Sequence, residues 1–362
     1  MGNWFFWAVK DILEDSEMKW KDKNITKLGF ICAVMVIALH SYSMASLVEG
    51  TSFYPQLIKT LISYISHGLT TVAVPIFFFL SSYLLFKNVD SIQELLGKLR
   101  KRTKTLIIPY LCWNVLYFLF YILTGSMSMR TESMTMDYSL RGIIEGVIFH
   151  KYCFNLWFLL NLIVFTYVFS VPVFYLLKTK LVWIVWLLLL GSTFITDITL
   201  NIVLTENEIS LFSLTHFLFW FLGAIWSKRE MPCYGYKVAL LGYFIISIAV
   251  MYIKESGSFS NIECILVLIN SACFLLSAKL WIEQIKAPKH NMNMVLYGGA
   301  GFVQIIYTKL ALAIAGALNA SPIIVLCLYL FEVLISVVIC YLVGVALKRY
   351  VQPLYKLFAG DR

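Results

Sequence analysis

The sequence predicts an all-α polytopic membrane protein, a bundle of about ten transmembrane helices with its N- and C-termini in the cytoplasm. Of the 362 residues, 60% are hydrophobic and only 14% are charged, and the mean hydropathy is +0.81. A soluble domain of this size needs a more polar surface. The apolar residues also form blocks of roughly 20, the length that crosses a hydrocarbon core about 30 Å thick.

Ten apolar blocks are long enough to be predicted as spans. If the N-terminus is cytoplasmic, most of the 29 Lys and Arg residues fall in segments on the cytoplasmic side, as the positive-inside rule describes. We therefore expect a multi-pass protein of the inner or plasma membrane. The net charge of +9 then reflects orientation and contact with anionic membrane lipid, and no nucleic-acid partner is predicted. The blocks cover 28–47, 61–86, 106–124, 153–177, 181–199, 211–227, 238–254, 262–280, 294–317 and 322–347.

The regions outside the blocks are short. Residues 1–27 predict a cytoplasmic or interfacial segment, 28–347 the ten-helix domain, and 348–362 a cytoplasmic tail. The start carries no cleavage site and is not read as a signal peptide. Between the second and third blocks, Leu95, Leu96 and Leu99 share one helical face opposite basic residues, which predicts an amphipathic helix on the inner membrane surface. Any chemistry is therefore expected in or between the spans.

Three ionisable residues lie inside the apolar blocks and away from their outer ends: His40, Lys309 and Glu332. Such groups are costly in lipid and usually face the interior of a helix bundle or a wet cavity. Because a short turn joins the last two blocks, we expect Lys309 and Glu332 to form a structural ion pair. The alternative is that they form the polar lining of an outward-facing cavity. The eight cysteines include no C-x-x-C pair, so no metal site is predicted.

His40 closes an apolar run and is followed by the polar residues Ser41, Tyr42 and Ser43. This cluster predicts a wet pocket, in which a neutral imidazole is a competent general base for a hydroxyl group. The alternative is a histidine whose hydrogen bonds are satisfied within the core.

Four stretches, in this order along the chain, resemble the family 3 membrane acyltransferases. The resemblance implies an integral membrane O-acyltransferase that moves an acyl group, commonly acetyl from acetyl-CoA on the cytoplasmic side, to a hydroxyl of a cell-surface polysaccharide or lipid-linked glycan. It implies that His40 is catalytic, as base or acyl relay, and that acyl-CoA is a substrate with no bound cofactor. The stretches are "GFICAVMVIALHS" (29–41), "VAVPIFFFLSSYLLFKN" (72–88), "RTKTLIIPYLCWNVLYFL" (102–119) and "NLWFLLNLIVFTYVFSVPVFYLL" (155–177).

The resemblance departs from the family at position 29. The family has an arginine eleven positions before the histidine, where this chain has Gly29, and the nearest cation is Lys27. A glycine cannot clamp a phosphate or carboxylate as arginine does. An alternative function is therefore a polysaccharide or glycolipid exporter, or an inactive accessory protein, on the same fold.

Candidate substrate-binding residues fall into two groups. Basic residues near the inner face are candidates to attract the phosphates of acyl-CoA, with lipid contact as the alternative; they are Lys27, Arg100, Lys101, Arg102 and Lys104. Polar and aromatic residues are candidates to bind the acceptor, with Trp157 as either a sugar-stacking platform or interfacial packing; they are Ser81, Ser82, Trp157, Asn161, Lys309 and Glu332.

Overall fold

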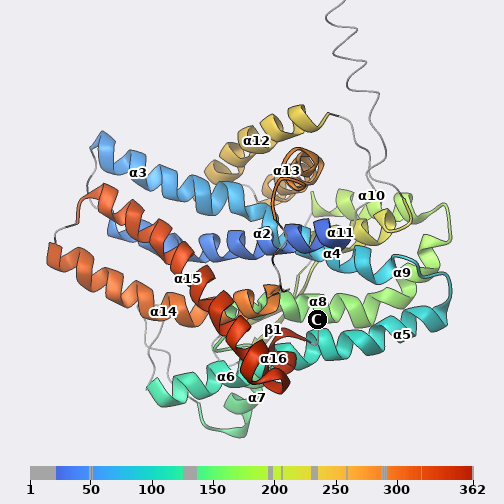
Figure 1. Ribbon diagram of the computed structural model, residues 1–362. Coiled ribbons are helices and arrows are strands. Elements are labelled where there is room, and N and C mark those ends of the chain that lie inside the picture. Colours follow the sequence, from blue (N-terminus) through green and yellow to red (C-terminus); the bar gives the residue numbers. More distant parts are fainter. Residues whose placement is uncertain are drawn as a thin grey trace, which may run out of the picture.

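The computed structural model describes residues 22–48, 50, 52–124, 137–194, 199–204, 207–229, 235–257, 260–286, 288, 290, 292–318 and 320–360. Most of the segment predicted as interfacial, residues 1–21, lies outside this range. The main helices, shown in Figure 1, are α2 (Asp22–His40), α3 (Phe53–Ser63), α4 (Ala73–Phe86), α5 (Ile92–Arg102), α6 (Ile108–Thr124), α7 (Leu140–Ile148), α8 (Trp157–Val164), α9 (Ser170–Leu177), α10 (Val182–Thr193), α11 (Leu214–Trp226), α12 (Tyr236–Ser256), α13 (Ser260–Trp281), α14 (Asn293–Leu318), α15 (Pro322–Tyr350) and α16 (Gln352–Ala359).

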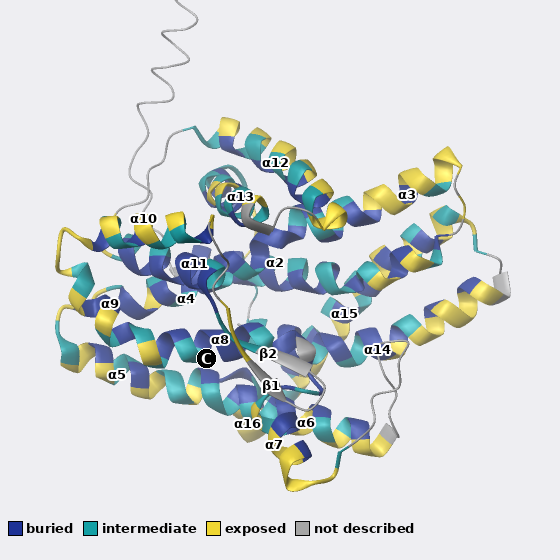
Figure 2. Cartoon of the chain, turned by 180° about the vertical axis from the view of Figure 1, so that it is seen from behind, coloured by how far each residue is buried: buried dark blue, intermediate teal, exposed yellow. Residues whose placement is uncertain are grey.

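Eight helical segments within the described residues are long and apolar enough to cross a membrane. Their outward faces carry large exposed apolar side chains, such as Leu334 and Leu342 on α15, each 60% exposed. Figure 2 shows exposed residues along the outside of α3, α10 and α12. Exposed apolar surface on this scale suits a lipid environment, so the prediction of a helical multi-pass membrane protein is confirmed. The segments are Lys23–Leu47, Phe53–Phe86, Ile92–Leu123, Trp157–Leu176, Tyr236–Ser256, Ile262–Trp281, Asn293–Gly316 and Pro322–Tyr350.

The remaining two predicted spans form shorter helices. α10 has 12 residues and α11 has 13, so at 1.5 Å per residue they are about 18–20 Å long, less than the hydrocarbon core. Two antiparallel strands, β1 (Thr199–Leu204) and β2 (Asn207–Ser213), connect them. The prediction of helix at residues 199 and 211–213 was wrong, because these residues belong to the two strands, in which "TLNI" and "EISL" alternate polar and apolar residues with the period of a strand.

The sequence suggested that α5 is a separate amphipathic helix on the inner membrane surface. The structure differs, since α5 continues into α6 as one helical segment, Ile92–Leu123, and Figure 1 shows the two end to end. Leu95 and Leu99 are buried as expected, whereas Leu96 is 45% exposed. A π-helical turn, Thr103–Ile107, precedes Pro109 and accommodates the proline without ending the helix. As a result, the last turn of α5 packs against α4.

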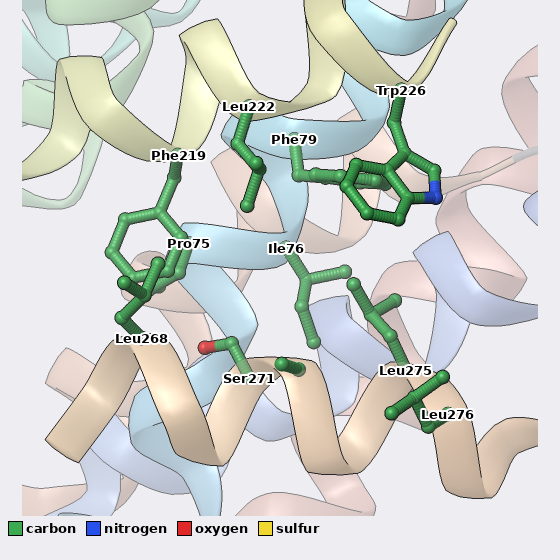
Figure 3. Close-up of a pocket in the computed structure, with 11 residues that line it drawn as sticks. Pro75, Ile76, Phe79, Phe219, Leu222, Trp226, Leu268, Ser271, Leu275 and Leu276 are labelled. Carbon is green, nitrogen blue, oxygen red and sulfur yellow. The ribbon is translucent and has the colours of Figure 1, made fainter. Parts of the chain in front are cut away.

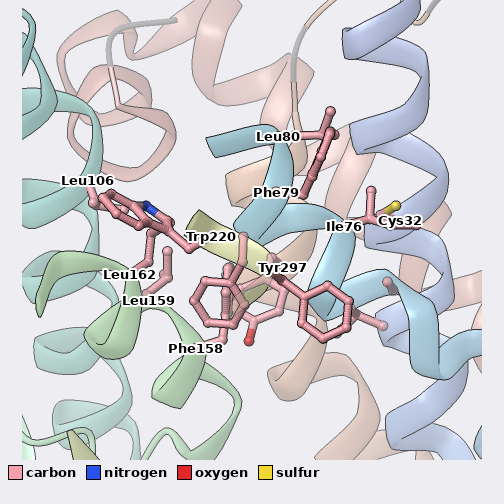
Figure 4. Close-up of a cluster of buried hydrophobic side chains, with 14 of the residues drawn as sticks. Cys32, Ile76, Phe79, Leu80, Leu106, Phe158, Leu159, Leu162, Trp220 and Tyr297 are labelled. Carbon is pink, nitrogen blue, oxygen red and sulfur yellow. The ribbon is translucent and has the colours of Figure 1, made fainter. Parts of the chain in front are cut away.

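α4 lies at the centre of the hydrophobic core. Figure 4 shows the aromatic and aliphatic side chains that gather around it, among them Ile76, Phe79 and Trp220. α11 approaches α4 at Gly223, where an added Cβ would lie 2.1 Å from the Phe79 carbonyl oxygen. The Ser82 hydroxyl donates a hydrogen bond to the Trp220 carbonyl across the same contact. This packing fixes α4 and α11 relative to each other and so fixes the cavities between them.

The predicted C-terminal tail packs back on the bundle. α15 continues to Tyr350, and α16 lies against α6, where Trp113 Nε1 donates to the Phe358 carbonyl oxygen at 3.1 Å. The placement of both termini in the cytoplasm stays a prediction.

Candidate active site

His40 lines a cavity of about 340 Å³, here called the His40 cavity. His40 is the last residue of α2, and the chain then tightens into a 3-10 turn, Ser41–Leu47. Residues from α4, α8, β2, α11, α12, α13 and α14 complete the wall. The full lining is Leu39, His40, Thr71, Val74, Pro75, Trp157, Ser213, Thr215, His216, Phe219, Lys254, Glu263, Cys264, Val267 and Tyr297.

The His40 cavity combines two imidazoles, a cation, a carboxylate, four hydroxyl-bearing residues and an indole. Trp157 packs edge-on against His216, with ring centroids 4.9 Å apart. Lys254 and Glu263 bring opposite charges to the same wall. Hydroxyl and charged groups beside an aromatic face suit a ligand with many hydroxyl groups, and an imidazole suits proton transfer to or from one of them.

A second cavity of about 170 Å³, here called the Arg102 cavity, is lined by Gly29, Ser81, Arg102 and Asn293 together with apolar residues. Arg102 reaches it from the end of α5 and is anchored on Ser81, with Nη1 donating to the hydroxyl and Nη2 to the carbonyl oxygen at 2.6 Å. The guanidinium therefore shares a cavity with Gly29, the position that lacks the arginine. The apolar lining is Ile25, Phe77, Leu80, Leu84, Leu106, Phe158, Leu159, Leu162 and Met294, with Thr26, Thr105 and Tyr297 completing the wall.

Tyr297 lines both cavities. Its hydroxyl donates to the Asn155 carbonyl oxygen, and its ring packs edge-on against Phe158 with centroids 4.5 Å apart. One buried aromatic side chain thus belongs to the wall of the cavity that holds the imidazole and to the wall of the cavity that holds the guanidinium.

An apolar groove of about 170 Å³ adjoins the His40 cavity and shares Pro75 and Phe219 with it. Figure 3 shows its walls, formed by Phe219, Leu222 and Trp226 on one side and by Leu268, Leu275 and Leu276 on the other, with α4 between them. The groove runs along α11 from Phe219 to Trp226, which is about 10 Å at a rise of 1.5 Å per residue.

The structure brings only some of the predicted binding residues to these cavities. His40 meets Trp157 in one, and Ser81 meets Arg102 in the other. Ser82 is part of the α4–α11 contact. Arg100, Lys101 and Lys104 are exposed and belong to neither lining.

Two further predicted residues hold the backbone in place. Lys27 Nζ donates to the Ile282 carbonyl oxygen at 2.8 Å. Asn161 Nδ2 donates to the Ser210 carbonyl oxygen at 2.8 Å and so ties β2 to α8, which satisfies a backbone group of the hairpin within the apolar region.

The predicted ion pair between Lys309 and Glu332 is wrong. Glu332 is fully buried and accepts a hydrogen bond from Thr308 at 3.1 Å, whereas Lys309 is exposed. Consecutive helical residues point about 100° apart, so when Thr308 faces α15 its neighbour Lys309 faces away. Neither Lys309 nor Glu332 lines a cavity described above.

Several lining residues had no assigned role in the sequence analysis. His216 and Glu263 carry a signal, since both are ionisable and lie near the ends of apolar blocks, and Lys254 ends its block in the same way. Tyr297 and Asn293 carry none, because a tyrosine and an asparagine near a span end are ordinary residues.

Comparison with known families matches residues 28–345 to the acyltransferase domain of the acyltransferase 3 family. No curated protein and no solved structure matches the chain. The matched range contains the lining of the His40 cavity, that of the Arg102 cavity except Ile25 and Thr26, and nearly all of the helical bundle. The chain therefore belongs to the acyltransferase 3 family of membrane acyltransferases.

Proposed function

We propose that the protein transfers an acetyl group from acetyl-CoA, supplied on the cytoplasmic side, to a hydroxyl of a lipid-linked glycan or surface polysaccharide. The observation that carries this proposal is the pair of cavities that meet at Tyr297. A transferase whose donor and acceptor come from opposite sides of a membrane needs two such compartments separated by a thin wall.

The Arg102 cavity is the proposed donor side. Its guanidinium carries a permanent positive charge, which suits the phosphates of a coenzyme A thioester or its polarised carbonyl oxygen. Arg102 enters the cavity in which the family arginine would stand at position 29. We infer that this chain has kept a cation in the cavity and changed the helix that supplies it.

The His40 cavity is the proposed acceptor side. The neutral imidazole takes the proton of the acceptor hydroxyl as its oxygen attacks the acyl carbonyl. An ester C–O bond forms, the thioester C–S bond breaks, and the coenzyme leaves as a thiolate that is protonated to the thiol. If the acyl group first moves to His40, a C–N bond forms as the thioester C–S bond breaks, and the acceptor hydroxyl then forms the ester C–O bond as the C–N bond breaks and its proton passes to the released imidazole, which has carried the acyl group past Tyr297.

The apolar groove favours a lipid-linked acceptor over a soluble one. It shares Pro75 and Phe219 with the wall of the His40 cavity and is lined by apolar side chains apart from Ser271. A glycan in the cavity and its lipid chain in the groove would each meet a matching surface.

The test is label transfer from radioactive acetyl-CoA in membrane vesicles of both orientations. Acetyl-CoA is too highly charged to cross a bilayer, so we expect label in inside-out vesicles and none in right-side-out vesicles. Lipid-linked glycan and polysaccharide are extracted and counted separately. Equal label in the two orientations, or no label above vesicles that lack the protein, would overturn the proposal, and the second result would favour an exporter or an accessory protein.

The position of Arg102 makes a separate prediction. Replacing Arg102 with alanine should lower kcat/KM for acetyl-CoA by about 10- to 100-fold, because a charge-assisted contact to the donor is lost. Gly29→Arg in the same chain should restore much of it, since a Cβ at Gly29 meets only the flexible amide end of Asn293, at 2.6 Å. Kinetics in inside-out vesicles would show this.

The matched control for Arg102 is Arg349→Ala, an exposed arginine at the end of α15. It should leave kcat/KM unchanged. If both alanine variants lose activity equally, the role of Arg102 is general surface charge and the assignment fails.

A further inference from the structure

Three spanning helices place polar groups opposite one another in the apolar interior, away from both cavities. The residues are spaced four apart on each helix and so share one face: Ile37 and Ser41, Gln304 and Thr308, and Glu332 and Ser336. We call them the polar cluster. Ser41, Glu332 and Ser336 have no exposed surface, and Gln304 is 1% exposed. All lie within the spans Lys23–Leu47, Asn293–Gly316 and Pro322–Tyr350.

Most donors of the polar cluster are already used. Gln304 Nε2 donates to the Ile37 carbonyl oxygen at 2.9 Å and to Ser41 Oγ at 3.1 Å. Ser41 Oγ donates to the Ile37 carbonyl oxygen at 3.1 Å, and Thr308 Oγ1 donates to Glu332 Oε1 at 3.1 Å. Among the hydroxyl groups of the polar cluster, only that of Ser336 has no hydrogen-bond partner, and it can still donate or accept.

The acceptors of the polar cluster are in excess. Gln304 Oε1, Glu332 Oε2 and Ser336 Oγ are all buried without a hydrogen-bond partner. The Ile37 carbonyl oxygen and Ser41 Oγ both accept from the Gln304 amide, so Nε2 must face them and Oε1 is left without a partner. Ser41 also lies beside the Glu332 carboxyl, and Gln304 and Thr308 reach Ser41 and Glu332 from the same face of α14, so the side chains of Gln304 and Glu332 both adjoin one hydroxyl. Unpaired oxygens at this depth are costly, and their missing partner must be positively polarised.

No side chain among the described residues supplies that positive charge. The ion pairs formed by the described residues do not include Glu332, and Lys309 on the neighbouring helix is exposed. A single carboxylate matches a single positive charge, whereas divalent calcium sites usually gather several carboxylates.

We propose that the polar cluster binds one sodium ion, held by Glu332, Gln304 and Ser336, with Ser41 within reach. This goes beyond the proposed acyl transfer and does not depend on it. Carboxylate, amide and hydroxyl oxygens are the ligands that hard cations prefer. Because Ser41 directly follows His40, a bound ion also fixes the end of α2 from which the imidazole projects.

The competing occupant is a proton on Glu332, and thermal unfolding separates the two. Purified protein in detergent is unfolded in sodium chloride and in choline chloride at equal ionic strength and pH. A ligand that binds only the folded state raises Tm with the logarithm of its concentration. We expect Tm to rise by about 2 °C for each tenfold increase in sodium above the dissociation constant, with no rise in choline.

Glu332→Gln keeps the shape of the side chain and removes its charge, so it should abolish the sodium effect. Glu255→Gln, an exposed carboxylate at the end of α12, is the matched control and should keep it. Ser336→Ala removes one ligand and should raise the sodium concentration needed. Binding of radioactive sodium to the wild-type protein gives a readout if Glu332→Gln does not fold.

Equal Tm values of the wild-type protein in sodium and choline would overturn the proposal, as would a sodium effect that survives in Glu332→Gln. A Tm that rises on acidification and ignores sodium would identify a protonated carboxyl instead. None of these outcomes requires acyl transfer, so failure here leaves the proposed function untouched.

Discussion

Replacing His40 with glutamine should lower the rate of acetyl transfer by about 10²–10⁴-fold, the usual contribution of a positioned general base. Glutamine has a similar size and can hydrogen-bond, but it cannot accept the acceptor's proton or carry an acyl group. His40 lies at the wall of a preformed cavity and is only half-buried, so the substitution should leave the fold intact. The measurement is label transfer in inside-out vesicles at matched protein levels.

The control for this variant is His290→Gln. His290 lies outside both cavities, where Nδ1 is 3.2 Å from Lys348 Nζ. It should keep wild-type transfer, and both variants should unfold at the wild-type temperature. Transfer that survives in His40→Gln would move the base to another group, with His216 in the same cavity as the next to replace.

Gly223→Ala should have the largest effect on stability. A methyl group at position 223 would lie 2.1 Å from the Phe79 carbonyl oxygen and 2.5 Å from Ser82 Oγ. The first contact is with helix backbone, which cannot rotate away, so α11 must shift off α4. Overpacking of a well-packed core costs about 1–3 kcal/mol and sometimes more, and a backbone clash belongs at or above the upper end.

The measurement is thermal unfolding in detergent, where we expect Tm to fall by about 4 °C or more. Gly191→Ala is the matched control, because it lies in the adjoining helix α10 and a Cβ there meets no atom within 4 Å. It should be neutral or slightly stabilising, since alanine favours helix. Equal Tm values for the two variants would show that the α4–α11 contact can adjust.

The sequence alone predicts the helical spans and a polar pocket at His40, because long apolar blocks and isolated ionisable residues are strong signals, whereas only the structure brings Trp157 to the same cavity. It does not predict the hairpin between α10 and α11, since short apolar runs fit strand and helix alike. The position of Arg102 depends on α5 and α6 forming one helix through a π turn. That continuity is decided by tertiary packing, and the sequence leaves it open.

The pairing of Lys309 with Glu332 failed for a different reason. A short turn predicts that two helices are neighbours, but it does not predict how each helix is rotated about its own axis. α14 is rotated by one residue relative to the prediction, so Thr308 contacts Glu332 and Lys309 faces outward. The shared wall at Tyr297 had no signal, because its importance comes from the two cavities on either side of it.

The shortness of α10 and α11 has a consequence for the surrounding bilayer. Helices about 18–20 Å long beside a core of about 30 Å create a hydrophobic mismatch, which membranes relieve by local thinning. The water boundary would then descend by about 10 Å next to these two helices, toward the first turn of α11, where His216 lies. An amphiphile diffusing in the membrane would reach the His40 cavity laterally from the thinned region, with its head group already at the depth of the cavity.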